Sequence, residues 1–279
     1  MDKEFRSCAR HILRDSQMKV ESILSGNVNT CIQIVDKASP IVILFGPPCC
    51  GKTLLLFRLV RYLCQMGCYV EPDTDFMPVD SLYQRRCKQF SEELFSDSCP
   101  TASVMLPVLI NVFDKQRRRV CYILEQSGEN CFDIQCKESP LRLKEIIECP
   151  NKKIWMFFVE KENKMDILTR QAYINRIMHI RTLMRQSDKA IVVCTKVDKD
   201  CMSFNGVDKR TLFKEIKDKY PGLFETFFNP NPILKYLCKY NFKFLPFSVG
   251  TFNNDSEGRL VYIQGDASFP KMLWKVIKD

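Results

Sequence analysis

The sequence has few of the residues and patterns found in zinc-binding, secreted and membrane-spanning proteins. Its 279 residues include only two histidines, and its fifteen cysteines form no C-x-x-C pair. A structural zinc site needs four such ligands at characteristic spacings, so zinc is disfavoured. The first residues carry no apolar run, and no stretch approaches the roughly 18 apolar residues of a membrane span. We therefore expect a cytoplasmic protein without a transmembrane segment.

The cysteines lie within apolar runs. Cys121 and Cys194, for example, are placed in segments that predict buried strands. Reduced cysteine behaves there as a small hydrophobic residue. Disulfide frameworks belong mainly to short secreted chains, so free thiols are expected.

The composition is that of a folded protein with a mild positive charge. Hydrophobic residues make up 46% of the chain and charged residues 27%, which is enough apolar material for a core. The net charge of +9 suits an anionic ligand, but it is too dispersed to indicate nucleic acid. The run Arg117–Arg119 is interpreted as a solvated turn at a sheet edge.

One stretch carries a strong phosphate-binding motif. Residues Ile41–Phe45 are apolar and predict a buried strand, and a helical pattern runs from Thr53 to about Met66. Between them, Gly46–Thr53 spells G-x-x-x-x-G-K-T, the phosphate loop of P-loop nucleotide hydrolases. The sequence therefore predicts a nucleotide-binding protein.

The residue types of this motif follow from the chemistry of polyphosphates. Glycines allow backbone N–H groups to surround an anion, and the positive end of the following helix points at the same charge. The Lys52 ammonium can reach the β- and γ-phosphates, and the Thr53 hydroxyl can ligate Mg²⁺. The nucleotide-binding residues expected in the loop are Gly46, Cys49, Cys50, Gly51, Lys52, Thr53 and Leu54.

The rest of the chain alternates strands and helices, which predicts a three-layer α/β P-loop NTPase fold. We expect a mostly parallel sheet with one antiparallel edge hairpin and helices on both faces. Residues 1–38 should hold an N-terminal helix and a short strand, and residues 39–279 a P-loop domain with an insertion at about 71–98 and a C-terminal helix extension. The expected strands are 31–35, 41–45, 104–112, 119–124, 152–159, 189–194, 242–247 and 260–263, and the expected helices are 1–25, 53–66, 79–95, 165–186, one or two within 208–240, and one from about 269.

A second motif indicates which base the bound nucleotide carries. Thr195-Lys196-Val197-Asp198 follows an apolar strand and resembles the [N/T]-K-x-D motif of Ras-like and translation-factor GTPases, the TRAFAC class. The aspartate carboxylate can accept hydrogen bonds from N1–H and the exocyclic amino group of guanine, a pattern that adenine lacks. The lysine stem would pack along the face of the base.

The resemblance implies further site residues in the expected order. Thr101 is the candidate switch threonine that closes over Mg²⁺ and the γ-phosphate. Residues 125–128 stand where the class carries D-x-x-G, so Glu125 would hold Mg²⁺ through water and the Gly128 N–H would bind the γ-phosphate. Glu129 would orient water or remain a solvated residue. Ser248 and Val249 resemble the loop whose backbone N–H contacts guanine O6.

These motifs predict a protein that binds GTP and GDP with Mg²⁺ and hydrolyses GTP slowly as a conformational switch. The sequence alone identifies no arginine to stabilise the transition state in cis, so turnover should depend on a protein partner, bound through the switch loops or the insertion at 71–98. The insertion and the step from Gly128 to Glu129 resemble the double-GTPase group. Two alternatives are an ATP-using P-loop kinase or AAA-like ATPase, and a nucleotide-gated interaction module without turnover.

Overall fold

The structure is a computed structural model that describes residues 32–94, 107–126, 128, 141–161, 165–197, 203–231, 233, 236, 238–254, 260–263 and 265–279. Residues 32–279 form one compact unit. The predicted N-terminal helix, Thr101, Glu129 and Asp198 lie outside the described residues.

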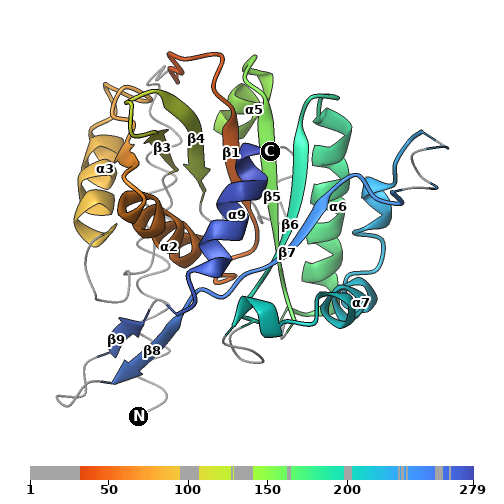
Figure 1. The fold of residues 1–279 in the computed structure, drawn as a ribbon. Coiled ribbons are helices and arrows are strands. Elements are labelled where there is room, and N and C mark those ends of the chain that lie inside the picture. The colour runs from red at the N-terminus through yellow and green to blue at the C-terminus, as the bar shows by residue number, and fades with distance from the viewer. Residues whose placement is uncertain are drawn as a thin grey trace, which may run out of the picture. The chain divides into compact units, whose positions relative to one another are not determined.

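A seven-stranded sheet forms the centre of this unit, with strand order β2-β3-β4-β1-β5-β6-β7 (Figure 1). β4, β1, β5, β6 and β7 run parallel, whereas β3 is antiparallel to both of its neighbours. The mostly parallel sheet and its antiparallel hairpin are confirmed. The strands are β1 Ile41–Phe45, β2 Tyr69–Pro72, β3 Val108–Phe113, β4 Arg119–Glu125, β5 Lys153–Glu160, β6 Lys189–Thr195 and β7 Lys243–Pro246.

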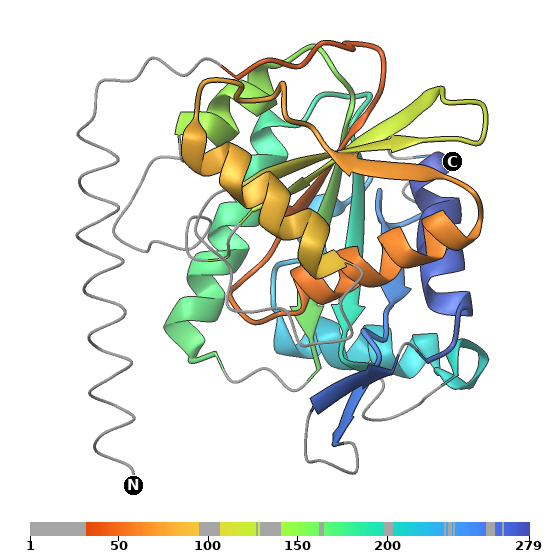
Figure 2. The same ribbon diagram turned by 90° about the vertical axis from the view of Figure 1, so that its left-hand side faces the viewer.

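The helices cover both faces of the sheet, as predicted. α2 and α9 pack against each other on one face, and Figure 2 shows α5 and α6 on the opposite face. Arg185, just after α6, donates hydrogen bonds to the carbonyls of Ile147 and Glu148 in α5 and so ties these two helices together. The helices are α2 Lys52–Gln65, α3 Ser81–Leu94, α5 Leu141–Glu148, α6 Ile167–Leu183, α7 Lys209–Lys219 and α9 Ser268–Lys278, with 3-10 turns η2 Phe204–Gly206 and η3 Glu225–Phe227.

The core fixes the carboxyl end of β1, where the phosphate loop begins. All five residues of β1 are buried, as its apolar, β-branched run predicts. Phe45, the last of them, stacks on Tyr173 of α6 and meets Phe157 of β5 edge-on. The Tyr173 hydroxyl also donates to the carbonyl oxygens of Phe45 and Phe158, at 3.2 and 2.7 Å. One side chain thus joins the ends of β1 and β5.

Helix α2 begins and ends as its sequence predicts. Gly51 precedes it in the left-handed conformation, with φ of 88°. At the other end Gly67 has φ of 81°, and the Cys68 N–H bonds to the Leu63 carbonyl. This is a Schellman-type end, in which glycine avoids the steric cost of a left-handed residue.

Three expectations about secondary structure are wrong. No strand forms at 32–35: the Gln33 N–H bonds to the Phe76 carbonyl, and Ile32 and Ile34 pack on the core of the domain. β2 lies outside the predicted hairpin, where no strand was expected. β8 (Thr251–Asn254) also forms where no strand was expected, and it pairs with β9 (Leu260–Ile263).

β2 shows why that expectation failed. Pro72 cannot donate a ladder hydrogen bond, and its acidic neighbours are typical of turns. An edge strand tolerates proline because one of its sides needs no partner. Among the described helices, none has the length and apolar character needed to cross a membrane.

Candidate phosphate and nucleotide site

The phosphate loop follows β1 directly and turns through two left-handed residues. Cys49 has φ of 60° and Gly51 has φ of 88°. Gly46 is required for a different reason: a Cβ there would lie 2.6 Å from the Phe158 Cβ. Left-handed residues in such turns help to form the N–H concavities that bind anions. The loop therefore has a backbone suited to phosphate, at the amino end of α2.

The Lys52 side chain lies back across this loop. Its ammonium group donates to the carbonyl oxygens of Gly46 and Pro47, at 2.9 and 2.7 Å. Lys52 is almost fully buried, and the two carbonyl oxygens accept hydrogen bonds from its ammonium group. The ammonium therefore lies within the loop, which is the position from which a P-loop lysine reaches phosphate oxygens.

Two oxygen ligands predicted from separate motifs meet beside the loop. The Thr53 hydroxyl donates to the Glu125 carboxylate. Glu125 is the last residue of β4, opposite Leu44 on β1, and it is only 5% exposed. Burial raises the pKa of Glu125, while the Thr53 hydrogen bond and the nearby charges of Arg86 and Lys52 lower it. Mg²⁺ in phosphate sites commonly takes one or two carboxylates with hydroxyl, water and phosphate oxygens, so this pair fits the ion.

The glycine of the second motif adjoins the phosphate loop. Gly128 is buried, and a Cβ on it would lie 2.3 Å from the Pro48 nitrogen. No larger residue fits there without moving the loop. The structure thus brings Gly128, Lys52, Thr53 and Glu125 together at the carboxyl ends of β1 and β4.

A buried arginine that the sequence analysis did not identify borders this cluster. Arg86 of α3 places Nη2 3.6 Å from Glu125 Oε2, and Nη1 3.5 Å from Glu93 Oε2. Its side chain is 2% exposed, and among the described residues Nε and Nη1 have no hydrogen-bond acceptor. The helical spacing of the buried residues Tyr83, Cys87 and Phe90 was a usable signal, because it puts Arg86 on the same face.

The predicted base motif also reaches the phosphate loop. Thr195, at the end of β6, is fully buried and donates its hydroxyl to the Cys50 carbonyl at 2.8 Å. Lys196 follows with φ of 61°, and its ammonium pairs with Glu160 at 2.9 Å. Asp198 lies outside the described residues. Thr195 therefore attaches the end of β6 to the loop, and Lys196 extends from that point.

The loop after β7 approaches from the other side. Ser248 and Val249 are buried, and Val249 Cγ1 lies 3.3 Å from the position that a Cβ on Gly51 would take. The two segments predicted to contact guanine therefore both adjoin the phosphate loop.

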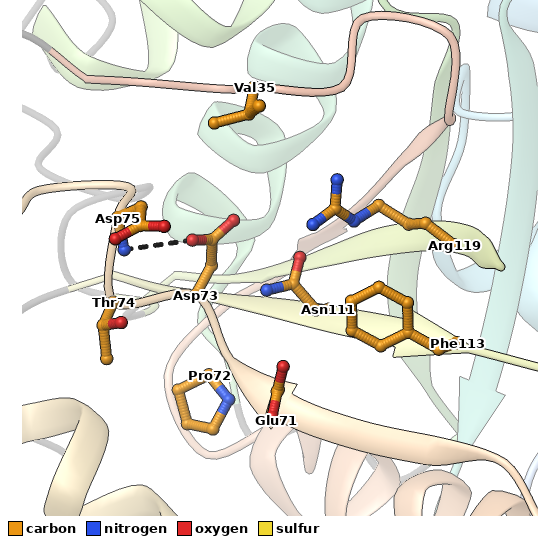
Figure 3. Close-up of a pocket in the computed structure, with 9 residues that line it drawn as sticks. All are labelled: Val35, Glu71, Pro72, Asp73, Thr74, Asp75, Asn111, Phe113 and Arg119. Atoms are coloured by element: carbon orange, nitrogen blue, oxygen red, sulfur yellow. Dashed lines mark hydrogen bonds between the residues drawn. The ribbon is translucent and has the colours of Figure 1, made fainter. Parts of the chain in front are cut away.

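A cavity of about 360 Å³ lies elsewhere (Figure 3). Its lining includes Asp73, Asn111 and Arg119, and Asn111 pairs with Tyr122 of β4, three residues before Glu125. Three strand residues span about 10 Å, so Asn111 lines the cavity about that far along the sheet from Glu125.

No family model and no curated protein matches the sequence. Similar solved structures include nucleolar GTP-binding protein 1 of Plasmodium falciparum, at 14% identity and a TM-score of 0.41 over 88% of each chain. The Ski7 GTPase-like domain of S. cerevisiae, bound to GDP and inorganic phosphate, is 17% identical at a TM-score of 0.43, over 86% of this chain and 50% of that one. The SRb-GTP/SRX complex of the signal recognition particle receptor from Chaetomium thermophilum is 14% identical at 0.41, over 79% and 94%.

The TM-scores are below 0.5, so we infer nothing about function from these similarities. The fold class is assigned from the arrangement of the strands and helices. A central β1 leads through a glycine-containing loop into α2, within a mostly parallel sheet covered on both faces. This is a three-layer α/β P-loop fold.

Proposed function

We propose that this protein binds GTP and GDP at residues 46–53 and hydrolyses GTP slowly as a conformational switch. The observation that carries the proposal is the contact between Thr53 and Glu125 beside the buried Lys52. These residues come from motifs more than seventy positions apart, yet they converge where a P-loop protein handles its β- and γ-phosphates.

Each residue has a distinct proposed role toward the phosphates. Lys52 would exchange its bonds to the Gly46 and Pro47 carbonyls for bonds to phosphate oxygens. The Thr53 hydroxyl would ligate Mg²⁺ directly, and Glu125 would hold it through water. Mg²⁺, when bound, supplies positive charge to the phosphates.

The switch would depend on the γ-phosphate. Gly128, against the phosphate loop, would donate its N–H to this group, and Thr101 would close over it. Loss of the γ-phosphate would release both segments, as in order–disorder switching. Glu129 would orient water in hydrolysis, and partners would bind the switch loops or the insertion at 71–98.

Base selection is proposed for the other side of the site. Asp198 would accept two hydrogen bonds from guanine, with Lys196 along the face of the base. Thr195 supports this role indirectly, because its bond to the Cys50 carbonyl holds the end of β6 beside the phosphate loop.

The test is nucleotide identity together with turnover. Fluorescent GDP, GTP and ATP analogues are titrated in Mg²⁺, and phosphate release is followed in the same samples. GTP and GDP should bind well ahead of ATP, with slow phosphate release. Equal or tighter ATP binding would refute the guanine proposal and favour an ATP-using enzyme. GTP binding without phosphate release would indicate a nucleotide-gated module.

Two variants assign the site. Lys52→Ala should abolish nucleotide binding, whereas Lys37→Ala, at an exposed lysine, should leave it unchanged. Asp198→Asn should shift preference from guanosine to xanthosine nucleotides, because the amide reverses one donor–acceptor pair. Retained binding in Lys52→Ala, or unchanged GTP affinity in Asp198→Asn, would contradict the respective assignment.

A further inference from the structure

The loop that follows β7 is held by a buried arginine of the phosphate-loop helix. Arg58 of α2 is 1% exposed and donates Nη1 to the Ser248 carbonyl. Its Nη2 donates to the Asp266 carbonyl at 2.6 Å. The guanidinium also lies over the rings of Phe247 and Phe269, with Cζ 5.7 and 5.6 Å from the ring centroids. Arg58 therefore fixes this loop to the helix that begins at Lys52.

The β8–β9 hairpin holds the next residue of the same loop. The hydroxyl of Tyr262, on β9, donates to the Val249 carbonyl at 2.7 Å. Gly250 has φ of 93°, and a Cβ on it would lie 2.4 Å from the Ile263 carbonyl oxygen. Arg61, one helical turn after Arg58, lies over the Tyr262 ring with Cζ 5.3 Å from its centroid. The hairpin and α2 thus hold the loop from two sides.

These bonds set the direction in which the loop presents its N–H groups. In a trans peptide the C=O and the following N–H point in opposite directions. Because Arg58 binds the Ser248 carbonyl, the Val249 N–H is directed away from Arg58. The Gly250 N–H is already used by the Ser248 hydroxyl, at 3.2 Å. Among the described residues, none accepts a hydrogen bond from the Val249 N–H, and Val249 packs beside Gly51.

We propose that Tyr262 and Arg58 are positioning residues for base recognition, which hold the Val249 N–H toward the carbonyl of a bound purine. This inference rests on the proposed function, because it presumes a nucleotide whose phosphates occupy residues 46–53. It assigns the β8–β9 hairpin a part in nucleotide selection, although the hairpin lies outside the main sheet (Figure 1).

Tyr262→Phe is the sharpest test, because it removes only the hydroxyl and keeps the ring that Arg61 covers. Affinities are measured for GDP, for ATP and for inorganic tripolyphosphate, which has phosphates but no base. We expect the preferred nucleotide to bind about 3- to 10-fold more weakly, which corresponds to one neutral hydrogen bond. Tripolyphosphate affinity should not change.

The control is Tyr236→Phe, since Tyr236 is 93% exposed. A purely structural role for Tyr262 would weaken nucleotide and tripolyphosphate equally, and this would overturn the inference. Unchanged nucleotide affinity would overturn it too. Arg58→Lys provides a second variant, whose single ammonium cannot reproduce the two-pronged contact. Arg58→Lys should also weaken nucleotide binding, by more than Tyr262→Phe does, and should leave the affinity for tripolyphosphate unchanged.

The two proposals fail in different ways. Wild-type protein that prefers ATP would refute both proposals, because adenine has no carbonyl oxygen to accept a hydrogen bond from the Val249 N–H. Wild-type protein that binds tripolyphosphate but no nucleotide would refute both. Nucleotide binding in the wild type that Tyr262→Phe leaves intact would refute only the positioning role.

Discussion

Replacing Arg86 by methionine should destabilise the protein in a way that depends on pH. The substitution keeps much of the side-chain volume but leaves the Glu125 carboxylate without its guanidinium. Both side chains are buried, at 2% and 7% exposure, and the closest atoms are 3.6 Å apart. At an effective dielectric constant of about 20, two unit charges at that distance attract by roughly 4–5 kcal/mol.

The loss of stability in this variant has an upper limit, because Glu125 can take up a proton instead of remaining charged and unpaired. The ordinary pKa of this group is 4.5. Burial holds the pKa of Glu125 above this value in the folded protein, and each pH unit above the folded pKa adds about 1.4 kcal/mol to the cost of protonation, so the upper limit lies below about 3.4 kcal/mol at pH 7 and below about 1.4 kcal/mol at pH 5.5. Removing Arg86 raises the pKa of Glu125 further. The stability difference between the variant and the wild type should therefore grow as the pH rises through this range.

Urea unfolding at both pH values, in EDTA to remove divalent ions, measures this difference. The matched control is Arg85→Met, at an exposed neighbour on the same helix, which should change stability by less than about 0.5 kcal/mol. In a Glu125→Gln background, where the carboxylate charge is gone, Arg86→Met should lower the free energy of unfolding clearly less than it does in the wild type. A loss that is the same at both pH values, or that persists in full in the Glu125→Gln background, would refute the electrostatic reasoning.

Three further predictions concern the backbone and the caps. Gly46→Ala should weaken nucleotide binding and lower stability by about 1–3 kcal/mol, since its Cβ would lie 2.6 Å from Phe158 Cβ. Gly222→Ala, strained but with no atom within 4 Å, should leave nucleotide binding unchanged in the same titration. Asp208→Ala removes the N-cap of α7, whose carboxylate accepts from the Arg210 and Thr211 amides, and should lower the midpoint of thermal unfolding. Hydrogen bonds from the Ser268 and Phe204 amides hold the pKa of Asp266 below its usual value, so its stabilisation is lost as the pH falls through that lowered value. Asp266→Asn should therefore lose less stability than the wild type between pH 7 and about pH 3 in thermal scans.

The sequence predicted those parts of the fold whose local signals agree with one another. β1 is uniformly apolar, Gly46–Thr53 has fixed spacing, and Gly67 ends α2 as its conformational freedom suggests. Thr53 and Glu125 were expected only as separate Mg²⁺ ligands, and the structure adds their direct contact, since parallel strands bring their carboxyl ends to one edge of the sheet. β2 was missed because Glu71 and Pro72 have the composition of a turn, and only pairing with β3 makes them a strand.

Long-range burial explains what the sequence could not show about the site. Arg86 is charged and lies in a segment that alternates charged and apolar residues, so its composition indicates an exposed position. The helical spacing of Tyr83, Cys87 and Phe90 puts Arg86 on their face, but its burial also depends on α3 packing near α2 and β3, which are distant in the sequence. Arg58 and Tyr262 were missed for the same reason, because each acts on a loop that is distant in the sequence.

The contacts of Arg58 have a consequence for the order in which the protein folds. They join α2 to residues 190 and 208 positions later in the chain. At synthesis rates of about 5–20 residues per second, these partners are synthesised roughly 10–40 s after the phosphate loop. Contacts of such long range also slow folding, because the intervening chain must first be ordered. During that interval a nascent chain carries an intact phosphate-binding motif without the loop proposed to recognise the base.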